Sequence, residues 1–211
     1  DVSDPMVPVL LRTVPINAQR VLVHDGVAYA AVGGDVAVVD LNTGELLQTL
    51  DLPQSYGPIT GMARDGALLF TYSEGFDLLR TIDISVHDNI RVVGEVAIPI
   101  ASGDVGLHAG NGLVWLAGSG LNSVDVSDPA HPVRVGQPGG LGFFAARRIS
   151  LNGSGLAVLA PDFSNRVEVY DVSDPSVVND KVLEFPLTHA ALDVAISRGL
   201  AYVGNGNQLS V

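Results

Sequence analysis

A five-residue phrase, Asp-Val-Ser-Asp-Pro, recurs along the chain and constrains its fold more than any other feature. The phrase stands at residues 1–5, 125–129 and 171–175, and two divergent copies begin at Asp40 and Asp83. Successive copies are separated by roughly 39–46 residues, a period typical of arrays in which each repeat is one supersecondary unit. Because such a unit cannot bury its apolar face alone, neighbouring units must stack.

The residues inside each repeat predict four short antiparallel strands. In the fourth repeat these strands cover residues 146–151, 155–160, 167–172 and 181–185, and Asn152-Gly153 forms the first hairpin turn. The other repeats fit the same frame, and no stretch shows a sustained helical period. Four strands in ~40–45 residues is the size of one propeller blade. We therefore predict an all-β fold: a β-propeller of about five four-stranded antiparallel blades, forming one domain over residues 1–211.

The two ends of the chain match each other in sequence. Residues 209–211 followed by residues 1–5 read almost the same as residues 122–129. We expect the N-terminal strand to close the last blade and complete a five-bladed ring. The alternative is that the five repeats belong to a larger propeller, since a repeat array can be divided at any period. Because the chain starts inside a repeat and without Met, we expect it to be part of a longer protein.

Composition excludes several classes of function. The formal net charge is −12, and Lys181 is the only lysine, so the basic surface of a nucleic-acid-binding protein is missing. There is no cysteine, which excludes disulfides, Cys-ligated zinc and a thiol nucleophile. No apolar run is long enough to insert into a membrane. The acidity is compatible with cations or with a basic partner.

The repeat also resembles a known family. The stretches 199–204 (Gly-Leu-Ala-Tyr-Val-Gly) and 124–132 (Val-Asp-Val-Ser-Asp-Pro-Ala-His-Pro) are similar to the LVIVD-repeat modules of β-propellers. The similarity extends over the whole chain, although the first two repeats depart from it at the Asp-Pro turn. It implies a bacterial or archaeal cell-surface or secreted protein in which the array serves display or adhesion. It brings no catalytic residues with it.

The recurring phrase itself has two interpretations. Calcium needs six to eight converging oxygens, usually from alternating carboxylates, whereas the two aspartates of the phrase are three residues apart and a proline follows directly. We favour a turn in which the Asp and Ser side chains cap the backbone and Pro fixes the next φ angle. We predict no metal and no cofactor.

Candidate binding residues come from the central mouth of the predicted propeller. Counting back six residues from each hairpin glycine gives Arg20, Thr60, Gly106, Arg147 and Asp193. Such variation within a constant frame suits a binding rim, although ordinary variable loop ends would look the same. Long connections toward this face add Tyr56, Asp104 and Phe143, and two histidines are predicted near the starts of innermost strands. The candidate ligand-binding set is therefore Arg20, Tyr56, Asp104, His108, Phe143, Arg147, His189 and Asp193.

Two classes of function fit these observations. The first is a non-catalytic scaffold of a cell-surface or secreted protein that binds a protein or carbohydrate partner, or that acts as a spacer. The second is a five-bladed enzyme similar to glycoside hydrolases, which would need two carboxylates converging in the central mouth. Asp104 and Asp193 are the only acidic residues that we nominate for that chemistry. Clustered carboxylates would favour the enzyme, and their absence would favour the scaffold.

Overall fold

A computed structural model describes residues 4, 6–52, 57–100, 104–137, 146–161 and 164–211, and of Arg147 only the backbone. Within these residues the chain forms strands and one short 3₁₀ turn, η1 (Glu74–Phe76). Among the described residues, no helix is long and apolar enough to cross a membrane. The all-β prediction is confirmed.

The strands form five antiparallel sheets in chain order. Sheets 1 and 2 consist of β1 (Arg20–His24), β2 (Val27–Val32), β3 (Asp35–Asp40) and β4 (Leu46–Leu50), then β5 (Ile59–Asp65), β6 (Leu68–Ser73), β7 (Leu78–Asp83) and β8 (Arg91–Ala97). Sheets 3 and 4 consist of β9 (Gly106–Gly110), β10 (Leu113–Gly118), β11 (Gly120–Asp125) and β12 (Val133–Gly136), then β13 (Ala146–Leu151), β14 (Leu156–Pro161), β15 (Arg166–Asp171) and β16 (Asp180–Pro186). Sheet 5 consists of β17 (Ala191–Ser197), β18 (Leu200–Asn205) and β19 (Gln208–Ser210). The predicted strands of the fourth repeat match these bounds to within one residue.

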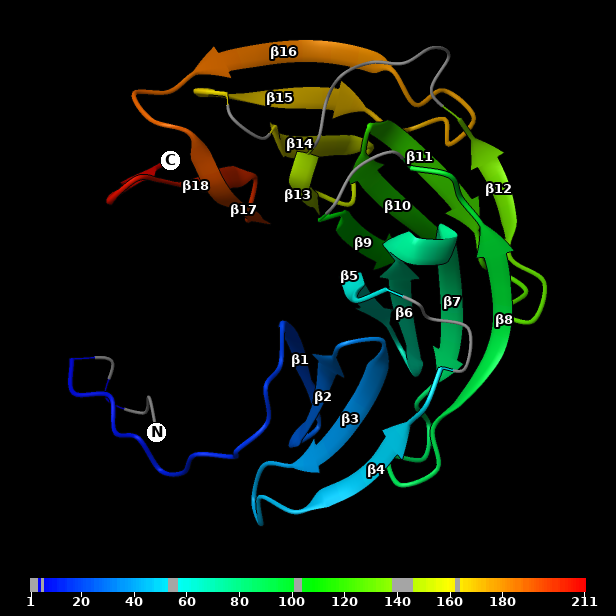
Figure 1. Ribbon diagram of the computed structural model, residues 1–211. Coiled ribbons are helices and arrows are strands. Elements are labelled where there is room, and N and C mark those ends of the chain that lie inside the picture. The colour runs from blue at the N-terminus through cyan, green and yellow to red at the C-terminus, as the bar shows by residue number, and fades with distance from the viewer. Residues whose placement is uncertain (1–3, 5, 53–56, 101–103, 138–145, 162–163) are drawn as a thin grey trace.

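The five sheets stand around a common axis as the blades of a β-propeller do. Figure 1 shows them following one another along an arc, with sheets 1 and 5 at its two ends. The innermost strands β1, β5, β9, β13 and β17 contact each other in this order. We call the end of the sheets where these strands begin the mouth face. The opposite end, which carries the first hairpin of every sheet, is the hairpin face.

Apolar side chains fill the space between consecutive sheets. Four separate clusters lie at the four junctions, each built from one sheet and the next. Tyr29, Phe70 and Trp115 occupy the third position of the second strand in sheets 1, 2 and 3, and each is buried toward the following sheet. Stacking of repeats through their apolar faces, as the sequence period predicts, is therefore observed.

The Asp-Val-Ser-Asp-Pro phrase forms the turn between the third and fourth strands. The Asp125 side chain accepts a hydrogen bond from the Ser127 backbone N–H at 2.9 Å, and Asp171 accepts one from the Ser173 N–H at 2.8 Å. The divergent copies use the same bond, because Asp83 accepts from the Ser85 N–H at 3.0 Å. This confirms the turn interpretation. In the described part of the chain no three Asp, Glu, His or Cys side chains are grouped so that they could hold a metal ion.

Each outer strand packs onto this turn of the next sheet. The contact is made by the residue of the outer strand that pairs with the fourth residue of the third strand. In sheets 1 to 4 this residue is Gln48, Gly94, Gly136 and Leu183, respectively. Gln48 bonds to the backbone N–H and C=O of Ile90. Gly94 and Gly136 are buried against the turns of sheets 3 and 4. Leu183, by contrast, is 52 % exposed, because the described part of sheet 5 contains no such turn.

The N-terminal segment does not complete sheet 5 in this structure, so this part of the sequence prediction needs correction. Among the described residues, 6–19 form no strand and sheet 5 has three strands. Arg12 Nη1 instead donates a hydrogen bond to the Asn42 carbonyl, in sheet 1, at 2.7 Å. The segment leads directly into β1, and sheet 1 lies at the other end of the arc from sheet 5 (Figure 1). Residues 1–3 and 5, which begin the predicted closure, lie outside the described residues.

Candidate functional site

The mouth face contains five positions that are equivalent by strand pairing. In each sheet, one residue of the innermost strand pairs with the fifth residue of the second strand, and these residues are Arg20, Gly61, Gly106, Arg148 and Asp193. Counting along the sequence identifies Arg20, Gly106 and Asp193 correctly. It selects Thr60 and Arg147 in place of Gly61 and Arg148, because the glycine occupies a different place in these two hairpins. Gly66 directly follows the paired residue Asp65, and in sheet 4 five residues separate the paired residues Leu151 and Ala157. The hairpin of sheet 4 is also longer than the others.

Two ion pairs connect different sheets at the mouth face. Arg20 Nη2 lies 3.1 Å from Asp104 Oδ1, which joins the start of β1 to the residues before β9. Arg148 Nε lies 3.4 Å from Asp193 Oδ1 and joins β13 to β17. The Asp104 side chain is 41 % exposed and that of Asp193 is 74 % exposed. The rim thus contains ion pairs that join one sheet to another, and their carboxylates remain partly exposed to solvent.

These pairs bear on the enzyme alternative. A glycoside hydrolase needs one carboxylic acid that holds a proton and a second carboxylate on the other side of the bond. Both nominated carboxylates instead face a guanidinium group, and they belong to sheets 3 and 5. In this structure each nominated carboxylate is therefore paired with a cation.

The two candidate histidines lie in different environments. His108 is the third residue of β9, and burial lowers the pKa of its imidazole, an effect that Asp65 opposes. His189 is exposed, two residues before β17, and its Nδ1 lies 3.1 Å from the Thr188 hydroxyl. No described contact joins the two rings. Tyr56 and Phe143 lie outside the described residues, and so does the Arg147 side chain.

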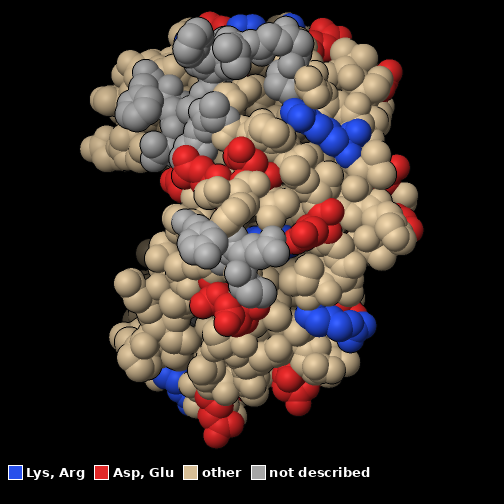
Figure 2. Space-filling model, turned by 45° about the vertical axis from the view of Figure 1, so that its right-hand side comes forward, with Lys and Arg blue, Asp and Glu red and all other residues tan. Residues whose placement is uncertain are grey.

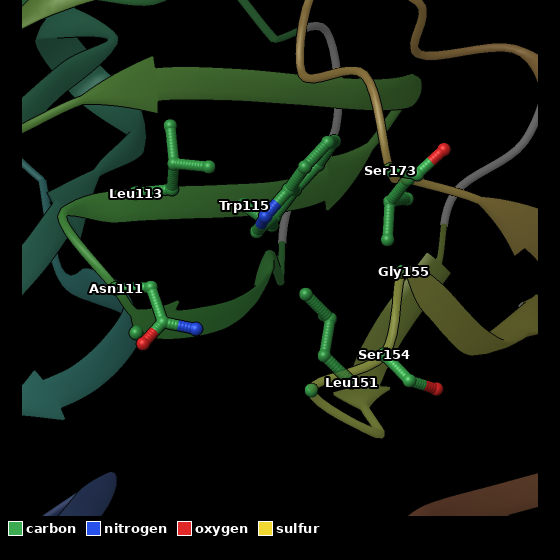
Figure 3. Close-up of a pocket in the computed structure, with 10 residues that line it drawn as sticks. Asn111, Leu113, Trp115, Leu151, Ser154, Gly155 and Ser173 are labelled. Carbon is green, nitrogen blue, oxygen red and sulfur yellow. The ribbon is translucent and has the colours of Figure 1, made fainter.

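A pocket that sequence reasoning missed lies on the hairpin face, between sheets 3 and 4. It has a volume of about 300 Å³, and Trp115, Leu113 and Leu151 form its apolar walls. Its edges come from two hairpins and one turn: Gly110, Asn111, Gly153, Ser154, Gly155, Val172 and Ser173. Figure 3 shows the indole nitrogen of Trp115 and the Asn111 amide turned toward this space. The extra Ser154-Gly155 in the hairpin was the available sequence signal.

A smaller pocket of about 110 Å³ lies in the turn of sheet 4. Asp171, Asp174 and Asp180 line it. Two of these carboxylates already accept backbone N–H groups of the turn itself, from Ser173 and Ser176. The hydroxyl groups of the same two serines also donate hydrogen bonds to Asp171 and Asp174. The hydroxyl bonds have the largest effect on the pKa of each carboxyl group, and together with the N–H bonds they lower it. The acidic cluster is therefore explained by the turn.

The charge of the surface follows the composition. Figure 2 shows acidic side chains in several separate groups over the face in view. With a formal net charge of −12, the protein surface repels anionic partners and attracts basic ones at moderate salt.

Comparisons with known proteins show the fold. No family model matches the chain, and no curated protein matches it. A chain of the mitotic checkpoint complex aligns with a TM-score of 0.67 at 12 % identity, covering 86 % of this chain and 55 % of that one. The β-propeller domain of Cps50 (Swd1) from Myceliophteria thermophila aligns with a TM-score of 0.68 at 14 % identity. The chain has the β-propeller fold.

The alignment with the Swd1 propeller covers 90 % of this chain and 63 % of that domain. The chain thus spans between about half and two thirds of the length of these two aligned chains. At 12–14 % identity the likeness concerns the arrangement of sheets alone, and it carries no residue of a site from either protein.

Proposed function

We propose that this propeller is a non-catalytic scaffold that binds a basic protein partner on its mouth face. The observation that carries the proposal is the pair of inter-sheet ion pairs, Arg20–Asp104 and Arg148–Asp193. Each holds a partly exposed carboxylate at a fixed place on a rigid rim, so a partner can bind without paying the entropy of ordering these side chains. Propellers with a similar arrangement of sheets include a chain of a multi-protein complex.

Charge favours a basic partner. The net charge is −12, and such a surface accelerates the encounter with a positively charged protein in a salt-dependent way. The resemblance to LVIVD repeats supports the further proposal that the scaffold belongs to a cell-surface or secreted protein and serves adhesion or spacing there.

Site-directed cross-linking tests the proposed face. Because the chain has no cysteine, a single Cys carries one photo-cross-linker. Asn207→Cys places it on the mouth face, in the turn after β18, and Asn89→Cys places it on the hairpin face, before β8; both residues are exposed. We expect one defined protein to be cross-linked from position 207 only, with a yield that falls as salt rises. Equal yields from both positions would contradict the proposed face.

The enzyme alternative is tested in parallel. Wild-type protein and the Asp104→Asn and Asp193→Asn variants are incubated with aryl glycosides, and release of the aryl alcohol is followed. We expect no release from any of the three proteins. Hydrolysis by wild type that either substitution abolishes would establish the enzyme and contradict the scaffold proposal.

A further inference from the structure

The pocket beside Trp115 differs from the corresponding space at another sheet junction. Tyr29 in sheet 1 occupies the same strand position as Trp115 in sheet 3, and its hydroxyl lies 2.6 Å from Nδ1 of His87 in the next sheet. That bond satisfies the polar atom and joins the two sheets there. Between sheets 3 and 4, no described residue accepts a hydrogen bond from the Trp115 indole N–H, and the pocket lies in this place.

Hydrogen bonds within the hairpin between β13 and β14 hold one wall of the pocket in shape. The hairpin between β13 and β14 runs from Asn152 to Gly155, two residues longer than the Asp25-Gly26 hairpin of sheet 1. The Asn152 side chain holds its shape by accepting the N–H groups of Ser154 and Leu156 at 2.8 and 3.1 Å. Gly155 has a φ of 89°, a conformation that favours glycine. The extra residues therefore form a fixed rim opposite the Trp115 side chain.

The lining defines the chemistry of a ligand. Its walls are apolar, and two groups that can donate hydrogen bonds, the Trp115 indole and the Asn111 amide, face the space (Figure 3). No charged residue lines this pocket, so an ionic ligand would lose its hydration without gaining a partner. A neutral ring with apolar C–H groups and hydroxyl oxygens satisfies both the walls and the donors. A volume of about 300 Å³ lies at the small end of ligand sites.

We propose that this pocket binds a neutral sugar ring, either a free monosaccharide or the terminal residue of a glycan. The indole N–H and the Asn111 amide bind ring hydroxyls, and Leu113 and Leu151 pack on the C–H face. The site is on the hairpin face and the proposed protein-binding site is on the mouth face, so either proposal can fail without the other.

Intrinsic fluorescence reads this site directly, because Trp115 is the only tryptophan of the chain. The probes are glucose, galactose, mannose and N-acetylglucosamine, each as the free sugar and as the methyl glycoside. We expect a saturable change in emission with at least one of them, in the millimolar range. Saturation with the methyl glycoside as well as the free sugar indicates a terminal glycan residue; saturation with the free sugar alone indicates a monosaccharide site.

Two matched variants locate the binding. Asn111→Gly removes the amide and keeps the positive φ of 56°, and Asp25→Gly makes the same kind of change in the hairpin of sheet 1, where φ is 49°. We expect Asn111→Gly to weaken binding at least tenfold and Asp25→Gly to leave it unchanged. Circular dichroism checks that both variants fold. Absence of a saturable signal with every neutral probe would overturn the proposal, and so would equal affinity in Asn111→Gly or equally tight binding of glucuronate.

Discussion

Replacing Gly94 with alanine tests whether each outer strand is held by the turn of the next sheet. A Cβ atom at Gly94 would lie 2.2 Å from the Pro129 carbonyl oxygen and 2.9 Å from Pro132 Cδ. The turn cannot easily yield, because Asp128 Oδ1 binds the Ala130 N–H at 3.1 Å. The outer strand β8 must therefore move away from sheet 3.

The magnitude follows from two opposing effects. Overpacking of a closely fitted contact costs about 1–3 kcal/mol. Alanine in a strand is favoured over glycine by roughly 0.5–1 kcal/mol when space is available, which offsets part of that cost. We expect a net loss of about 1–2 kcal/mol in the free energy of unfolding. For a protein of this size, that corresponds to a decrease of about 2–8 °C in the melting temperature.

The assay is urea and thermal unfolding followed by circular dichroism, with Gly204→Ala as the control. Gly204 also lies in a strand, but a Cβ atom there would meet no atom within 4 Å. This control should be as stable as wild type or more stable by up to about 1 kcal/mol. If Gly94→Ala unfolds at the same urea concentration as Gly204→Ala, the close contact between β8 and the turn of sheet 3 does not contribute to stability and the reasoning fails.

Four further substitutions probe other features by the same unfolding measurements. Gly153→Val should cost about 1–3 kcal/mol, because a β-branched residue resists a φ of 77°; unchanged stability would refute the hairpin assignment. Glu168→Gln should cost about 1–3 kcal/mol, because this buried carboxylate binds Arg166 and Tyr170, each at 2.9 Å, whereas an equal loss with a surface glutamate such as Glu184 would contradict that account. Leu183→Ser should change stability by less than about 0.5 kcal/mol, and a loss of about 2 kcal/mol would mean that a turn of sheet 5 covers this residue. Asp125→Asn should make stability fall less steeply in acid. The Ser127 hydroxyl and N–H lower the folded-state pKa of Asp125. The ionised Asp125 carboxylate therefore contributes stability above its unfolded-state pKa of about 3.9, and this contribution is lost as the pH falls from that value through the folded-state pKa.

Much of the fold could be predicted because the information is local. Alternating apolar residues and hairpin pairs such as Asn111-Gly112 locate strands within one repeat. Both of these residues have the positive φ angles that Asn-Gly hairpin turns require. The Asp-Pro phrase could be assigned to a turn because each aspartate caps a backbone N–H two residues ahead. No knowledge of another repeat is needed for either inference.

The candidate site was harder to predict from the sequence, because its contacts join different repeats. Asp104 and Asp193 could be nominated from their positions, but their arginine partners come from other sheets. Arg148 could not be distinguished from Arg147, since the length of the hairpin between β13 and β14 decides which one pairs with Ala160. The Trp115 pocket depends on a hairpin and a turn of the following sheet.

The sequence by itself determined the repeat unit, its strands, its capped turns and the need for the units to stack, because all of these follow from side chains close together in the chain. The tertiary structure alone decided how the units meet. It places Arg12 against sheet 1 and leaves the described part of sheet 5 with three strands. It also leaves a space beside Trp115, whereas Tyr29 bonds to His87 across the corresponding junction. Whether such a space is filled depends on the distance and angle between two sheets, which no single repeat encodes.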